Sequence, residues 1–204
     1  MTQAVVPAVP VVPVETAPVT RGYPTAWWGM VVLIATEAMI FLVLLSAYFF
    51  VRSSSTTWPL GGIEAPELTR SSIFTVILLA SSIPIFWMEH ALARGHMRQV
   101  EAGLAISFVM GAAFLVNTAY DFREFGFGWR DNTYASLFYV ILGLHALHVA
   151  AGLLMNGTVQ AKVLTGRVSA EHHVTPDVFA LYWHFVDGVW IFVFASLFLA
   201  AHIV

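Results

Sequence analysis

Residues 134–160 read YASLFYVILGLHALHVAAGLLMNGTVQ, an apolar run without a single Asp, Glu, Lys or Arg. Roughly 20 residues at about 1.5 Å each cross a hydrocarbon core about 30 Å thick, so this run predicts a membrane-spanning helix. Four further apolar runs occupy residues 27–50, 73–88, 100–120 and 178–204. The sequence therefore predicts an all-α membrane protein, with five transmembrane helices over residues 26–204 and a tail over residues 1–25.

The composition agrees with a chain whose solvent is the bilayer. Of its 204 residues, 59% are hydrophobic and 10% charged, whereas a soluble domain carries about 25% charged residues. A net charge of −3 leaves no basic surface for a nucleic-acid backbone. The absence of cysteine excludes disulfides, thiolate metal sites, iron–sulfur ligation and a cysteine nucleophile. Any redox chemistry must therefore use histidine or reside on a partner.

The tail is rich in proline and valine. Its prolines, Pro7, Pro10, Pro13 and Pro18, are spaced too tightly for a helix. It lacks the basic start and uninterrupted apolar run of a cleaved signal peptide. We therefore expect a flexible segment that is retained.

Several residues predict where the helices bend, begin and meet the membrane surface. Pro84 predicts a kink just after Ser81 and Ser82. The tripeptide 175–177, Thr-Pro-Asp, predicts an N-cap followed by a first-turn proline and an acid that the helix dipole favours. Aromatic residues near the ends of the runs are typical of interfacial belts: Trp27, Trp28, Trp58, Trp129 and Tyr134.

The basic residues indicate the orientation. Five crossings place the termini on opposite sides, and the side richer in Lys and Arg is normally cytoplasmic. Five basic residues fall with the N-terminus and four on the other side: Arg21, Arg94, Arg98, Lys162 and Arg167 against Arg52, Arg70, Arg123 and Arg130. This predicts a cytoplasmic N-terminus and a periplasmic C-terminus.

Five ionisable side chains lie within the predicted hydrocarbon core. Glu37 stands roughly 15 Å deep, where an ionised carboxylate costs about 2.5 to 3.5 kcal/mol, so it should face protein. His145 and His148 are spaced i, i+3, as are His184 and Asp187, so each pair shares one helix face. Counting along the helices places His148 level with His184 and His145 level with Asp187.

Three interpretations of these residues stay open. Imidazoles on facing helices, with Glu37 or Asp187, could hold a metal or haem, as in a stand-alone membrane enzyme. Intramembrane acids and histidines could mark a proton or ion path, as in a small transporter using Glu37, although the chain shows no internal repeat. The groups could also simply hydrogen-bond across the bundle or to a partner helix. No nucleotide-binding, zinc-protease or serine-hydrolase motif predicts an independent catalytic site.

Other polar residues favour loops or packing. We expect one set to lie in solvated loops: Glu89, His90, His96, His172 and His173. We expect a second set to form an exposed turn before Gly126 and Gly128: Asp121, Arg123 and Glu124. Gly103, Ser107 and Gly111 form a small-residue face that favours close helix contact.

Four segments of the sequence carry motifs of a known family. Residues 182–190, YWHFVDGVW, and residues 143–152, GLHALHVAAG, closely resemble the Trp-His-Phe-Val-Asp-x-Val-Trp signature and the Gly-Phe-His-Gly-x-His-Val-x-x-Gly motif of subunit III of the haem-copper respiratory oxidases. Leu144 and Ala146 are mild departures from the second motif. Glu37, in TEAMIF, stands at the glutamate of the family's Ser-Glu-x-x-Phe-Phe segment. YASLFY at 134–139 is similar to Tyr-Gly-Ser-x-Phe-Tyr. Thr118 and Asp121-Phe122 depart from the usual glutamine and Glu-Tyr.

The resemblance covers residues 26–204 and implies the short, five-helix bacterial form. It implies a non-catalytic subunit that binds no haem or copper, holds phospholipid, packs on subunit I and supports proton uptake and turnover stability. Its partners would be subunits I and II, with or without subunit IV, in a proton-pumping terminal oxidase of the bacterial inner membrane. Cytochrome c is the expected electron donor; a quinol oxidase and the accessory protein of a nitric oxide reductase system are the alternatives.

The resemblance also implies places for the intramembrane residues. Glu37 would lie toward subunit I at mid-membrane. His148 and His184 would line the inner half of the bundle, near lipid headgroups or water. Asp187 and His145 would make interhelical hydrogen bonds, and no metal site is expected.

Overall fold

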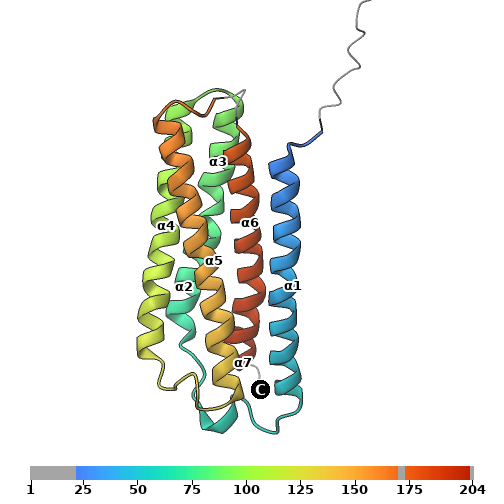
Figure 1. Cartoon of the computed structure of the whole chain (residues 1–204). Coiled ribbons are helices and arrows are strands. Elements are labelled where there is room, and N and C mark those ends of the chain that lie inside the picture. Colours follow the sequence, from blue (N-terminus) through green and yellow to red (C-terminus); the bar gives the residue numbers. More distant parts are fainter. Residues whose placement is uncertain (1–21, 170–172, 203–204) are drawn as a thin grey trace, which may run out of the picture.

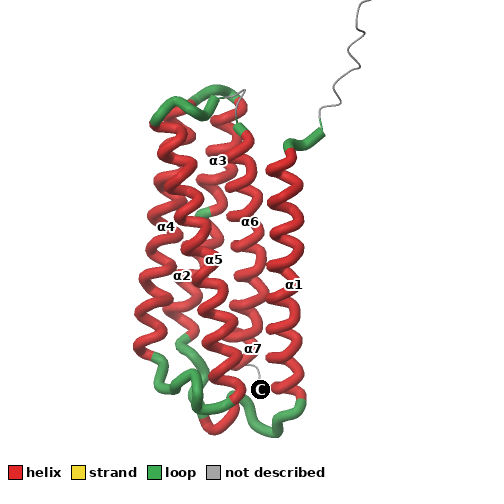
Figure 2. Tube along the Cα trace, in the orientation of Figure 1, coloured by secondary structure: helices red, strands yellow, loops and turns green. Residues whose placement is uncertain are grey.

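A computed structural model describes residues 22–169 and 173–202, and its regular elements are helices (Figures 1 and 2). The long helices run side by side along the bundle axis. In chain order the elements are α1 (Thr25–Ser53), η1 (Leu60–Gly62), α2 (Leu68–Ala80), α3 (Ser82–Ala93), α4 (Met97–Glu124), α5 (Thr133–Leu164), α6 (Val174–Phe194), η2 (Ala195–Leu199) and α7 (Ala200–His202).

Within residues 22–169 and 173–202, five helical segments are long and apolar enough to cross a membrane. They are Thr25–Ser53, Leu68–Ala93, Met97–Glu124, Thr133–Leu164 and Val174–His202. Each surrounds or overlaps one of the five predicted runs, so the prediction of five membrane-spanning helices is confirmed in length and composition. The α1-start end of the bundle, at the top of Figure 1, holds the α3–α4 and α5–α6 loops. The other end holds the α1–α2 and α4–α5 loops.

The second span is interrupted at Ser81, where α2 ends and α3 begins (Figure 2). Proline has no N–H, and its ring collides with the carbonyl four residues earlier, here that of Ala80. Pro84 therefore breaks the helix close to the predicted position. The buried Ser81 hydroxyl accepts a hydrogen bond from Trp183 Nε1 at 2.9 Å, which ties the break to α6.

Small residues let α4 approach its neighbours closely. A Cβ added to Gly103 would lie 2.6 Å from the Pro84 carbonyl oxygen, and one added to Gly111 would lie 2.7 Å from the Trp183 ring. Between them, the Ser107 hydroxyl accepts a hydrogen bond from Asn156 of α5 at 3.0 Å. The predicted small-residue face of α4 thus contacts α3, α5 and α6, and its packing role is confirmed.

The first helix stands apart from the others. Only 6% of the most apolar window of α1 is buried within the chain, against 39–44% for the other four spans. It packs along α6 and α5 at one edge of the bundle (Figure 1). The chain by itself therefore leaves most of an apolar, membrane-length helix uncovered.

One local prediction is wrong. The last helix starts at Val174, one residue before the Thr175 predicted as its N-cap. Instead His173 Nδ1 lies 2.6 Å from Asp177 Oδ2, which links the residue before the helix to its first turn, while Thr175 accepts a hydrogen bond from Lys162. Tyr134, at the start of α5, is fully buried and packs with Trp58. His172 and residues 1–21 lie outside the described residues.

Candidate functional site

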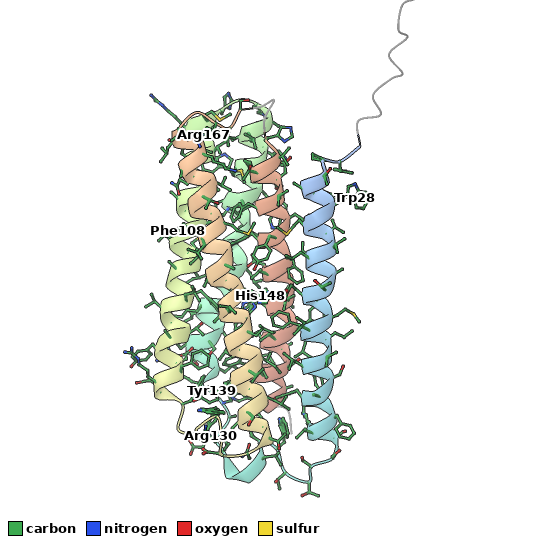
Figure 3. All side chains as sticks on the ribbon, in the orientation of Figure 1. Trp28, Phe108, Arg130, Tyr139, His148 and Arg167 are labelled. Atoms are coloured by element: carbon green, nitrogen blue, oxygen red, sulfur yellow. The ribbon has the colours of Figure 1, made fainter. Side chains whose placement is uncertain are left out.

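Glu37 on α1 faces His148 on α5. The carboxylate oxygen Oε2 lies 3.1 Å from Nε2 of the imidazole, and the two side chains are 29% and 10% exposed. Figure 3 places His148 near the middle of the bundle. Glu37 thus faces protein, as its expected depth required. Its predicted contact with subunit I stays a prediction.

The other nitrogen of His148 fixes how protons are arranged in this pair. Nδ1 lies 2.8 Å from the Leu144 carbonyl oxygen, so Nδ1 carries the proton and donates. A hydrogen bond between Nε2 and Glu37 then needs one more proton, on either the imidazole or the carboxyl group. Both arrangements are neutral overall, which lowers the cost of placing the two groups in a membrane.

An apolar groove opens over this pair, between α1 and α5. Its volume is about 450 Å³, and Tyr182 closes it from α6, with its hydroxyl donating to the His148 carbonyl at 3.1 Å. Apart from Glu37, His148 and Tyr182, the lining is apolar: Met30, Leu33, Leu144, Leu147, Ala151 and Met155. A partly exposed polar pair at the side of an apolar groove suits an amphipathic or acyl-chain ligand.

A second polar cluster joins α6 to α3. The Ser82 hydroxyl donates to Asp187 Oδ2 at 2.5 Å and lies 3.0 Å from His184 Nδ1. His184 Nε2 lies 3.7 Å from Glu89 Oε2, and the Phe86 ring stacks on the imidazole with centroids 4.2 Å apart. The expected interhelical hydrogen bond of Asp187 is present, and its partner is Ser82.

His145 behaves differently from the prediction. It is fully buried, and neither ring nitrogen finds a hydrogen-bond partner among the described residues. Its ring packs against Trp190, with centroids 4.6 Å apart, and against Phe114 and Phe41. The predicted interhelical hydrogen bond of His145 is wrong, because the residues that surround the imidazole are aromatic rings rather than polar groups.

The four bundle residues do not converge on one centre. His148 faces α1, whereas His184 and Asp187 face α3, and His145 lies among aromatic rings. In the part of the chain that the structure describes, no three His, Asp or Glu side chains are placed to share a metal ion. The four residues are distributed over separate faces of the bundle, so they do not come together as the metal or haem interpretation of the sequence assumed.

A third cluster lies near the opposite end of the bundle and corrects another prediction. Asp121 is not in an exposed turn: it lies in α4, 7% exposed, and binds Arg70 of α2 at 2.5 Å and Asn117 at 2.9 Å. Glu124, the last residue of α4, lies 3.4 Å from the same guanidinium. The helix continues four residues beyond the predicted run, and the turn with Gly126 and Gly128 follows it.

The sequence did not predict that two residues, Glu89 and Ser82, belong to the α3–α6 cluster. Glu89, expected in a loop, lies on α3, and Ser82 had no predicted role beyond the kink. Their spacing of seven residues places them on one face of α3, two turns apart, which was the available signal. A serine and a glutamate at that spacing are common in helices. The pair indicates a polar cluster only when the structure shows that it faces His184 and Asp187 of α6.

Comparisons with known proteins give a consistent result. A family model described as "Cytochrome c oxidase subunit III" matches residues 11–202. The chain is 35% identical to a cytochrome c oxidase subunit 3 of Thermostichus vulcanus, over 84% of this chain and 85% of that protein. It is 35% identical to one of Anopheles gambiae, over 90% and 71%, and 30% identical to one of Coturnix japonica, over 84% and 68%. The family match begins inside the tail, earlier than the quoted motifs.

Proposed function

The chain belongs to the cytochrome c oxidase subunit III family, and from this membership we propose that it is a non-catalytic subunit that supports proton uptake and turnover stability. As a member it is a subunit of an oxidoreductase complex and works with other oxidase subunits. The proposal concerns what this subunit contributes. The single observation that carries it is the Glu37–His148 pair, a proton-holding pair on a helix that this chain leaves uncovered.

The proposal places subunit I against the uncovered face of α1 and lipid in the groove between α1 and α5. An apolar groove of about 450 Å³ with a polar pair at its side favours a phospholipid acyl chain. Haem and copper would reside on the partner subunits I and II, because the His and acid side chains described above are already engaged or dispersed.

The setting that we propose is a bacterial inner membrane, with the α1-start end on the cytoplasmic side and cytochrome c as electron donor. The count of basic residues supports this orientation. The relatives named above are all cytochrome c oxidase subunits, which favours cytochrome c over the quinol and nitric oxide alternatives.

The test is Glu37→Gln in the complete oxidase. The amide keeps the shape of the side chain but cannot carry the proton that the Glu37 carboxyl group and His148 share. We expect the complex to assemble and its initial turnover to be retained. We also expect faster inactivation during sustained turnover, or fewer protons taken up per electron, measured by oxygen consumption and pH changes in reconstituted vesicles.

A matched control is Glu101→Gln on α4, which makes the same chemical change away from the groove. His148→Leu should reproduce the Glu37→Gln phenotype, and the double variant should add nothing further, because residues that act as a unit are not additive. Wild-type inactivation kinetics together with wild-type proton stoichiometry in Glu37→Gln would refute the proposal.

A further inference from the structure

Four side chains on α3 and α6 lie in a row that leads from the α1-start end into the bundle. Glu89 Oε2 lies 3.7 Å from His184 Nε2, His184 Nδ1 lies 3.0 Å from the Ser82 hydroxyl, and that hydroxyl lies 2.5 Å from Asp187 Oδ2. Both contacts of Ser82 are within hydrogen-bond distance, whereas Glu89 and His184 lie within ion-pair distance but beyond hydrogen-bond distance. The row is separate from the Glu37–His148 pair.

One end of this row is open and the other is closed. Glu89 and His184 line a pocket of about 290 Å³ at the α1-start end, together with Tyr23, Trp27 and Asp177. Their side chains are 35% and 25% exposed, whereas Asp187 is 5% exposed. The Phe86 ring covers one face of His184. A proton can therefore enter from the pocket at Glu89, while His184 Nε2 and Asp187 are shielded from solvent.

Ser82 can pass a proton in either direction, because its hydroxyl has one proton to donate and lone pairs to accept. In the first arrangement His184 is protonated on both nitrogens; Nδ1–H donates to the Ser82 oxygen, and Ser82 O–H donates to the Asp187 carboxylate. In the second, His184 is neutral with its proton on Nε2; the Asp187 carboxyl donates to Ser82, and Ser82 donates to Nδ1. The two arrangements contain the same atoms and the same total charge.

We propose that Glu89, His184, Ser82 and Asp187 form a proton-binding chain that takes up a proton from the pocket at the α1-start end and holds it on Asp187. In the exchange the His184 Nδ1–H bond and the Ser82 O–H bond break, a new O–H bond forms on Ser82, and the former Ser82 proton bonds to Asp187. Asp187 Oδ1 has no hydrogen-bond partner among the described side chains, so the neutral carboxyl group suits its buried site.

Among the described residues, few other titratable groups lie around these four side chains. Glu89 itself comes from α3; Tyr23 faces the row from the segment before α1, and Asp177 from the first turn of α6. On α1 and α5, Glu37, His145 and His148 belong to the groove and the aromatic site on other faces. On α2, the neighbour of α6 is the uncharged Thr75, which accepts from Trp190. The proposal goes beyond the proposed function, because it assigns proton binding to residues other than Glu37.

The test is pH-difference infrared spectroscopy on the complete oxidase, in H₂O and D₂O. We expect a pH-dependent band of a protonated carboxyl group that is lost in Asp187→Asn. In Ser82→Ala this band should shift its titration midpoint and exchange more slowly with D₂O. Ser82→Thr keeps the hydroxyl and should restore the wild-type behaviour, and Glu89→Gln should slow the exchange.

The outcomes separate this proposal from its alternatives. If Asp187→Asn does not assemble, the comparison of Ser82→Ala with Ser82→Thr decides. The proposal is overturned if no carboxyl band depends on Asp187, or if Ser82→Ala and Ser82→Thr behave alike. A carboxyl band that depends on Asp187, together with a wild-type phenotype in Glu37→Gln, would uphold the proposal for these four residues and refute the proposed function. The two failures are therefore distinguishable.

Discussion

Trp183 is the side chain on which three helices converge. Its ring lies against the backbone of α4 at Gly111 and of α5 at Gly152, and its Nε1 donates to Ser81 at the end of α2. A Cβ added at Gly152 would lie 2.8 Å from that ring, a distance that real Cβ atoms do not adopt. The spacing of α4, α5 and α6 therefore depends on two glycines that leave room for one indole.

Replacing one of these glycines should loosen the bundle. We expect Gly152→Ala to destabilise the subunit by about 1–3 kcal/mol, the usual cost of overpacking a filled core. The control is Gly157→Ala on the same helix, where a Cβ meets nothing within 4 Å, and which should be neutral or slightly stabilising. The measurement is the temperature at which the subunit dissociates from the detergent-solubilised complex; an equal shift for both variants would contradict the packing argument.

The break between α2 and α3 and the length of α4 show what sequence could and could not predict about elements. Pro84 acts on its own backbone neighbours, so a local rule predicted the interruption nearly to the residue. The position of Asp121 depends on a distant residue, because its carboxylate binds Arg70, 51 positions earlier in the chain. Local composition near Gly126 and Gly128 favoured a turn, and nothing local disclosed the guanidinium on the adjacent helix.

The groove between α1 and α5 yields a prediction about these two elements. Ala151 lines the groove, so Ala151→Phe should fill part of its 450 Å³ and reduce the number of phospholipids that the purified complex retains, counted by mass spectrometry. Leu154→Phe is the control, because Leu154 lies one turn away on α5, 75% exposed and outside the groove lining. Equal lipid retention in Ala151→Phe and wild type would argue against a lipid in this groove.

For the molecule as a whole, the sequence predicted the number of spans but not the partners of their polar residues. Counting along a helix gives the depth of a side chain, and the Tyr182–His148 hydrogen bond agrees with the antiparallel register that the count assumed. Depth says nothing about rotation around the helix axis. The count placed His148 and His184 at the same depth. It could not show that His148 turns toward α1 and His184 toward α3.

The uncovered face of α1 should be an interface in the assembled oxidase. Met39 and Val43 are 59% and 63% exposed within the chain. Because the chain has no cysteine, Met39→Cys and Val43→Cys each introduce a unique thiol. We expect a membrane-soluble maleimide to label these thiols at least tenfold more slowly in the complex than after detergent dissociation of the subunit. Equal labelling in both states would place the partner elsewhere.

The pairing of Glu37 with His148 also has a consequence for biosynthesis. The two residues are 111 positions apart, so α1 leaves the ribosome and meets the translocon well before α5 has been made. During that interval the Glu37 carboxyl group has no imidazole with which to share a proton. If it is charged, placing it in the membrane costs about 2.5 to 3.5 kcal/mol. The span that carries it is also the most apolar of the five. That excess of apolar residues allows the first helix to enter the bilayer on its own, ahead of the partner that later neutralises it.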